Sequence, residues 1–134
     1  MKTTLLFCLF LLLVGCQTNV ADNEPQEYKL DSLPSQIDAK VDVGKDFVFI
    51  LQENMTTGYA WEVVENMANV PVSLEHQGSK TRSVRGVPLV GAPGTAVVRI
   101  TPDRKGKGTV KLGYRRPWEK NAPIHNVTVN VNAK

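Results

Sequence analysis

Seven short segments of this chain alternate apolar with polar residues, and Gly, Pro and Asn residues separate one segment from the next. A period of two places every second side chain on the same face of a strand, as in a sheet with one buried face. Helical periodicity is poor after residue 35. We therefore expect an all-β domain in which two antiparallel sheets pack as a sandwich. The expected strands are residues 36–43, 46–52, 59–64, 72–76, 95–101, 109–115 and 126–131, with a short extra strand near residues 79–84.

The only cysteines, Cys8 and Cys16, lie in the N-terminal region. A basic start and an apolar run from Leu5 to Val14 precede Cys16, which is the layout of a secretory signal. The run is shorter than the roughly 20 apolar residues of a membrane-spanning helix. Gly15 directly before Cys16 makes the segment resemble a bacterial lipoprotein signal, which implies cleavage before Cys16 and a lipid on its sulfur. An ordinary signal peptide that happens to contain a cysteine is the alternative.

Removal of such a signal leaves a chain with no disulfide and no free thiol, because its one remaining cysteine would carry the lipid. The folded part is then stabilised by its packed core, and the chain has no cysteine for catalysis. Gln17 follows Cys16, and the absence of an aspartate there is compatible with delivery to the outer membrane of a bacterium that has two membranes. We expect a protein lipid-anchored to the bacterial cell envelope, with its domain facing the periplasm or the exterior.

The sequence divides into three parts of different composition. We expect a lipoprotein signal peptide over residues 1–15, a lipid-anchored flexible tether over residues 16–32 and one β-sandwich domain over residues 33–134. The tether is polar and has few apolar residues, so it cannot bury enough surface to fold by itself. A flexible stretch of this length spans roughly 20 Å on average, which would hold the domain clear of the membrane.

The charge and the histidine content argue against nucleic-acid binding and against catalysis. The formal net charge is only +3, and the densest basic cluster, residues 104–108, is expected to be a solvated hairpin turn. His76 and His125 stand alone, without an acidic cluster beside them in the sequence. No Gly-x-Ser-x-Gly motif, P-loop or metal-spaced cluster occurs. We therefore expect a monomer that is not an enzyme and that binds no metal, cofactor or nucleic acid.

Three connections between the expected strands carry residues suited to binding. Two of them contain glycines that permit tight turns or close approach of the backbone to another surface. The third ends in a tryptophan held by a preceding proline, which is an unusual exposure of apolar area for a loop. The residues are Asn54, Met55, Thr56, Thr57, Gly58 and Tyr59 in the first connection, Gly91, Ala92, Pro93 and Gly94 in the second, and Arg116, Pro117 and Trp118 in the third.

The positions of these connections decide how they are interpreted. Taken singly, each has a plain structural explanation: the first two could be ordinary turns, and Trp118 could pack back onto the core. However, they are every second connection in a walk through antiparallel strands, so all three should meet at one end of the sandwich. Loops presented by a rigid sandwich are a common place for binding sites.

The three segments, in this order, resemble the signature of the chagasin-type inhibitors of cysteine peptidases, inhibitor family I42. That family carries an Asn-Pro-Thr-Thr-Gly-Tyr-type loop, a Gly-x-x-Gly loop and an Arg-Pro-Trp-type loop, which correspond to residues 54–59, 91–94 and 116–118. Met55 departs from the pattern, because the family has proline there. The resemblance covers residues 33–134 and implies an immunoglobulin-like β-sandwich of about seven strands, in a bacterial lipoprotein form.

The resemblance also implies a mechanism. Thr56 and Thr57 would approach the catalytic Cys–His pair of a papain-like (C1 family) peptidase. Residues 91–94 would run along the non-primed side of its cleft, and Arg116 and Trp118 would cover the primed side. The expected function is reversible, competitive inhibition without a covalent bond. The alternative is a non-inhibitory cell-surface lipoprotein that uses the same sandwich for binding or for structure.

Overall fold

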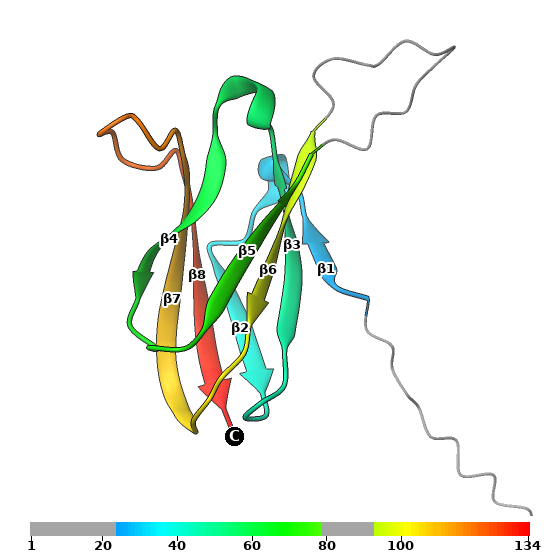
Figure 1. Cartoon of the computed structure of the whole chain (residues 1–134), viewed down its shortest axis with the longest axis vertical. Helices are drawn as coiled ribbons and strands as arrows, with labels where there is room; N and C mark the ends of the chain where they lie inside the picture. Colours follow the sequence, from blue (N-terminus) through cyan, green and yellow to red (C-terminus); the bar gives the residue numbers. More distant parts are fainter. Residues whose placement is uncertain (1–23, 79–92) are drawn as a thin grey trace, which may run out of the picture.

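The computed structural model describes residues 24–78 and 93–134. Within these ranges the chain forms two four-stranded sheets, with strand orders β1-β3-β6-β5 and β2-β8-β7-β4 (Figure 1). The elements are β1 (Gln26–Tyr28), the 3-10 turn η1 (Leu30–Ser32), β2 (Gln36–Val41), β3 (Phe47–Glu53), the 3-10 turn η2 (Met55–Thr57), β4 (Ala60–Asn66), β5 (Val72–Gln77), β6 (Gly94–Ile100), β7 (Gly106–Arg115) and β8 (His125–Ala133). The prediction of an all-β sandwich is confirmed.

The strands pair antiparallel with two exceptions. β1 pairs parallel with β3, and β2 pairs parallel with β8. Both exceptions are N-terminal edge strands, each followed by a connection that crosses to the other sheet, so neither needs the short hairpin that favours antiparallel pairing. All seven predicted strands are present, each with ends shifted by a few residues.

The core lies between the sheets and follows the alternation read from the sequence. In β8 the buried residues are Val127, Val129, Val131 and Ala133, whereas the residues between them are partly exposed. β3 lies centrally in its sheet and buries Phe49 and Leu51. The core cluster consists of Ile37, Ala39, Phe49, Leu51, Trp61, Val70, Ala96, Val98, Ile100, Val110, Leu112, Tyr114, Val127, Val129 and Val131. A polypeptide that begins at Gln17 therefore keeps the whole described core.

The predicted tether is corrected over residues 26–32. Residues 26–28 form β1, and the Tyr28 ring packs edge-on against Phe49 with 6.3 Å between ring centroids. The Leu30 amide then donates a hydrogen bond of 3.1 Å to the side-chain oxygen of Gln52. Because these contacts are made to the distant strand β3, the local composition gave no sign of them. The signal segment, Cys16 and the first part of the tether lie outside the described residues, as does the expected strand at residues 79–84.

A second correction concerns the basic cluster at residues 104–108. The prediction places all of it in a turn, but β7 begins at Gly106, so only its first two residues belong to the connection. Gly106 already pairs with Ala133 of β8. In the described ranges no helix is long and apolar enough to cross a membrane.

The connections alternate between the two ends of the sandwich. One end, which we call the loop pole, receives the β3–β4 and β7–β8 connections and the strand ends at Gln77 of β5 and Gly94 of β6 (Figure 1). The opposite end, the far pole, carries residues 42–46, 67–71 and 101–105 together with the C-terminus. The strand ends that lead to all three motif segments are therefore at one end, as predicted.

Candidate functional site

The first motif segment is a single 3-10 turn that Asn54 closes. The Asn54 side-chain oxygen accepts hydrogen bonds from the Thr56 amide, at 3.2 Å, and from the Thr56 hydroxyl. The Thr57 hydroxyl donates to the Asn54 carbonyl at 2.7 Å. Gly58 ends the turn in the left-handed region, with φ of +81°, and its amide donates to the Met55 carbonyl. Side-chain bonds to nearby backbone of this kind hold a short loop in one conformation.

The tip of this turn is exposed. The side chain of Met55 is 49% exposed, and Thr56 and Thr57 are also exposed. Both threonine hydroxyls point back to Asn54, so the methyl groups remain available for contact with a partner. The loop therefore presents a small, largely apolar tip on a hydrogen-bonded base, although Met55 stands where proline was expected.

An aromatic layer supports the turn from below. The Asn54 amide donates to the hydroxyl of Tyr114 at 2.8 Å. The Tyr114 ring packs on Trp61 and Tyr59, with centroid distances of 5.1 and 5.5 Å. Trp61 is buried, and its indole N–H donates to the Gln52 carbonyl at 2.9 Å. Burial raises the pKa of Tyr114, whereas the bond from the Asn54 amide acts in the opposite direction. The hydroxyl thus stays protonated and fixed beneath the turn.

The third motif segment contacts the first through Arg116. The Arg116 Nε donates to the Thr57 carbonyl at 2.9 Å, and its Nη1 donates to Glu119 at 2.9 Å. The guanidinium carbon also lies 4.6 Å from the centroid of the Tyr59 ring, a cation–π distance. One arginine therefore links the two connections and holds its own loop in shape.

Trp118 makes the second contact between the same connections. Its side chain is 70% exposed, so it does not pack back onto the core. One edge of the indole lies against Gly58: a Cβ added there would be 2.4 Å from Trp118 Cη2 and 2.8 Å from Cζ2. Gly58 is therefore required both for its positive φ and for the space that the indole occupies.

The second motif segment is only partly described. Gly91 and Ala92 lie outside the described residues. Pro93 is exposed, and Gly94 is buried and pairs with Glu53, the residue directly before Asn54. The structure thus brings residues 54–59 and 116–118 into contact and places the end of the second segment beside the start of the first.

A buried carboxylate and its histidine partner at the loop pole were not predicted from the sequence. Glu53 is fully buried, and both of its carboxylate oxygens lie 3.0 Å from His76 Nδ1. The Trp61 amide donates to the same carboxylate at 3.5 Å. His76 is a surface residue whose side chain is 33% exposed, and its ring is hydrogen-bonded to the buried carboxylate. The alternation in the sequence does place Glu53 on the inward face of β3, after Phe49 and Leu51.

The described residues offer no cluster of metal-ligating side chains. No group of three or more His, Cys, Asp or Glu side chains that could hold a metal ion occurs in residues 24–78 and 93–134. What the loop pole offers instead is a projecting edge of ordered turns and an exposed indole, a shape suited to entering a groove of another protein.

Comparison with known proteins agrees with this geometry. The sequence profile of the chagasin family peptidase inhibitors, family I42, matches residues 40–132. The chain belongs to this family. It is therefore a peptidase inhibitor and not an enzyme. Amoebiasin-1 of Entamoeba histolytica is 32% identical over 91 residues, which cover 68% of this chain and 84% of that protein.

Solved structures share the fold. The solution structure of Amebosin is 28% identical, with a TM-score of 0.59, and covers 83% of this chain and 99% of that one. The crystal structure of the cysteine protease inhibitor EhICP2 from Entamoeba histolytica has a TM-score of 0.54 over 81% of this chain and 94% of that one. At 23% identity, this second likeness shows the fold alone.

Proposed function

We propose that this inhibitor blocks papain-like cysteine peptidases reversibly and competitively by filling their active-site cleft with the β3–β4, β5–β6 and β7–β8 connections. The observation that carries the proposal is the direct contact between two motif segments that are far apart in the sequence. Arg116 reaches Thr57 across 59 residues, and Trp118 lies on Gly58. Side chains of both segments thus form one continuous projecting edge.

The chemistry of the target explains why such an edge can inhibit. Papain-like enzymes use a cysteine thiolate and a histidine in a cleft that must admit an extended substrate. In the proposed complex, Thr56 and Thr57 cover that pair, residues 91–94 follow the non-primed side and Trp118 covers the primed side. A covalent bond is not needed, because exclusion of the substrate is enough.

Preorganisation is the proposed source of affinity. Binding ordinarily requires loops and side chains to lose conformational freedom, and this loss weakens the complex. Here Asn54, Tyr114 and Arg116 already hold the β3–β4 turn before contact. An interface of ordinary size buries roughly 800 Å² on each partner, which three such connections could supply. Nanomolar affinity would correspond to about −12 kcal/mol.

The cellular location is part of the proposal. Cys16, at the end of the apolar N-terminal run, is the proposed site of lipid attachment, and the domain would be held in the bacterial cell envelope. Cys16 supports this because it directly follows Gly15 at the end of a signal-like segment too short to span a bilayer.

Titration of papain with residues 17–134 tests the inhibitory function. We expect stoichiometric loss of activity that added substrate reverses. If papain stays fully active with micromolar protein, the alternative of a non-inhibitory surface lipoprotein would be favoured for this chain. Mass spectrometry of the protein purified from bacterial membranes tests the anchor, since a diacylglyceryl group on Cys16 adds a defined mass.

A further inference from the structure

A groove at the far pole lies outside the proposed peptidase-binding surface. It has a volume of about 210 Å³ and lies where the open end of the core meets the β6–β7 connection. Its floor is apolar, and its rim is formed by the basic residues that the sequence places in one cluster. The lining residues are Ala68, Val70, Arg104, Lys105, Gly106, Lys107, Gly108, Val131 and Ala133.

The charge of this rim is of one sign. Three of the lining side chains are cationic, and none is a carboxylate. Arg104 contacts Asp103 at 3.2 Å on the exposed side of the connection. Within residues 24–78 and 93–134, neither Lys105 nor Lys107 forms a salt bridge with a carboxylate. The groove therefore offers two free ammonium groups to an anion.

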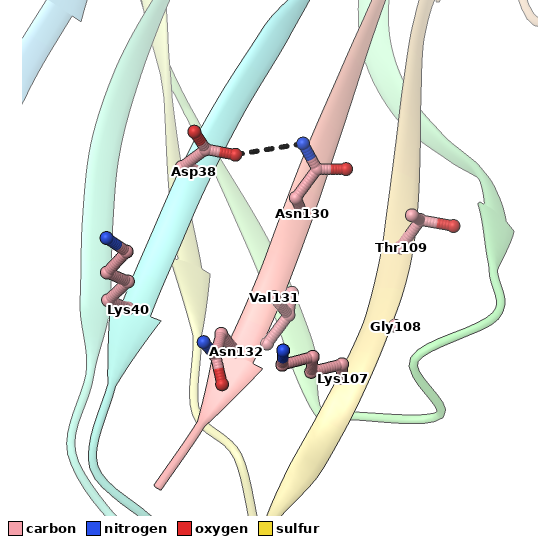
Figure 2. Close-up of a pocket in the computed structure, with 8 residues that line it drawn as sticks. All are labelled: Asp38, Lys40, Lys107, Gly108, Thr109, Asn130, Val131 and Asn132. Carbon is pink, nitrogen blue, oxygen red and sulfur yellow. Dashed lines mark hydrogen bonds between the residues drawn. The ribbon is translucent and has the colours of Figure 1, made fainter.

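Positive charge continues from the groove onto the adjacent sheet face. Lys107 also lines a shallow hollow over β2, β8 and β7, together with Lys40 (Figure 2). The only acidic residue of that hollow, Asp38, accepts a hydrogen bond of 2.9 Å from Asn130 (Figure 2). Lys40 and Lys107 thus extend the basic surface around the edge of the far pole.

The wall of the groove is built by close packing. The Ala68 amide donates to the Thr109 carbonyl at 3.0 Å. Gly108 packs tightly on Ala68 of the β4–β5 connection. A Cβ added to Gly108 would lie 2.4 Å from Ala68 Cα. The segment that carries Lys105 and Lys107 crosses between the two sheets and is held against the β4–β5 connection, so the cationic rim keeps its place beside the apolar floor.

The direction of β1 brings the N-terminal chain to the same pole. β1 runs parallel to β3, with Gln26 beside Phe49, so the chain enters the domain near the start of β3. Glu24, the first described residue, lines a hollow with Asp46 and Phe47 at this end. Residues 17–23 separate Glu24 from Cys16 and can span at most about 28 Å when fully extended. A lipid on Cys16 would therefore keep the far pole close to the membrane.

We propose that the far-pole groove binds the phosphate groups of anionic lipid headgroups, so that the domain stands on the membrane with its loop pole outward. This inference rests on the proposed lipid anchor at Cys16. The apolar floor and basic rim match a headgroup at the boundary of a bilayer, and basic residues near an anionic surface attract it over about a Debye length. β7 spans ten residues at about 3.4 Å each, so the sandwich would hold Trp118 roughly 30 Å from that surface.

Vesicle binding by residues 17–134 without lipid tests this inference. We expect co-sedimentation with phosphatidylcholine vesicles that contain phosphatidylglycerol, little with pure phosphatidylcholine, and a decrease as salt is raised. Lys105→Gln with Lys107→Gln should weaken binding about 25-fold, since each lysine near the surface contributes about fivefold. The matched control, Lys29→Gln with Lys120→Gln, removes the same charge away from the far pole and should keep binding.

Equal binding to both vesicle types, or equal loss in both double variants, would overturn the inference. Free phosphate is the other source of the same chemistry. If calorimetry shows that inorganic phosphate binds residues 17–134 while vesicles with phosphatidylglycerol do not co-sediment with them, the groove is a site for free phosphate and the membrane assignment is wrong. The Lys105→Gln, Lys107→Gln variant should inhibit papain as the native protein does. Papain inhibition and vesicle binding therefore test the inhibitory function and the lipid-binding groove independently.

Discussion

The indole of Trp118 lies on the α-carbon of Gly58, so two motif segments from different connections form one surface before any partner is present. The contact explains two sequence features at once. A glycine is needed at position 58 because the backbone is left-handed there, and also because the indole leaves no room for a side chain. The exposed tryptophan, in turn, has a fixed position although most of its surface faces solvent.

Substitution of Gly58 by alanine should therefore damage the site more than the fold. The alanine side chain should lower the free energy of unfolding by about 1 kcal/mol, because it is disfavoured on a left-handed backbone. The new methyl group should also displace the indole and weaken papain inhibition at least about tenfold. Inhibition constants for Gly58→Ala, Trp118→Ala and the double variant measure this coupling, and strictly additive losses would contradict it.

Arg116→Lys should weaken inhibition although it keeps the charge. A lysine cannot donate to Thr57 and Glu119 in the fork geometry of a guanidinium while it also lies over the Tyr59 ring. We expect about a fivefold to tenfold loss of affinity, the equivalent of about 1 kcal/mol for a charge-assisted bond. Arg104→Lys at the far pole is the matched control, and an equal effect of both on papain inhibition would argue against a positioning role for Arg116.

Tyr114→Phe should loosen the β3–β4 turn. Loss of the hydroxyl leaves the partly buried Asn54 amide without its acceptor, which should lower the free energy of unfolding by about 1 kcal/mol. Hydrogen exchange at the Asn54 amide should become faster, as measured by NMR. Tyr28→Phe serves as the control because no hydrogen bond of its hydroxyl occurs in the described residues. Unchanged exchange at Asn54 would show that the turn is held by other contacts.

Asp46 should contribute to stability in a pH-dependent way. Hydrogen bonds from Thr101 and then from Arg99 hold the pKa of Asp46 below its ordinary value of 3.8. Because the folded-state pKa is the lower one, the contribution is fully present above pH 3.8 and is lost as the pH falls through the folded-state pKa. The stability difference between the native protein and Asp46→Asn, measured by urea unfolding, should be constant near neutral pH and shrink below 3.8. A difference that does not change with pH would exclude this linkage.

Much of the fold could be predicted because its signals are local. In β8 the residues with β-propensity alternate with polar ones, and each of the predicted inward residues Val127, Val129 and Val131 is buried. β1 could not be predicted in this way. Its three residues are polar except for Tyr28, and their order depends on pairing with β3 and on the contact with Phe49.

The candidate site could also be predicted only in part. The order of the motifs and their alternation between connections predicted that they would meet at one pole. The contacts that join them could not be predicted from the sequence. The packing of Trp118 on Gly58 and the hydrogen bond from Arg116 to Thr57 depend on how the two sheets pack. Glu53 could not be predicted for a different reason: a carboxylate is buried on this inward face only because His76 and the Trp61 amide form hydrogen bonds with it.

The measurement that tests the central claim most directly is the papain inhibition constant of Trp118→Ala beside that of Met67→Ala. Both side chains are largely exposed, 70% and 69%, but Trp118 lies at the loop pole and Met67 at the far pole. We expect Trp118→Ala to lose about 2 kcal/mol of affinity, roughly thirtyfold, while its Tm changes little. Met67→Ala should inhibit as the native protein does. If both variants inhibit equally well, or if Trp118→Ala unfolds the domain, the loop pole is not the surface that blocks the peptidase.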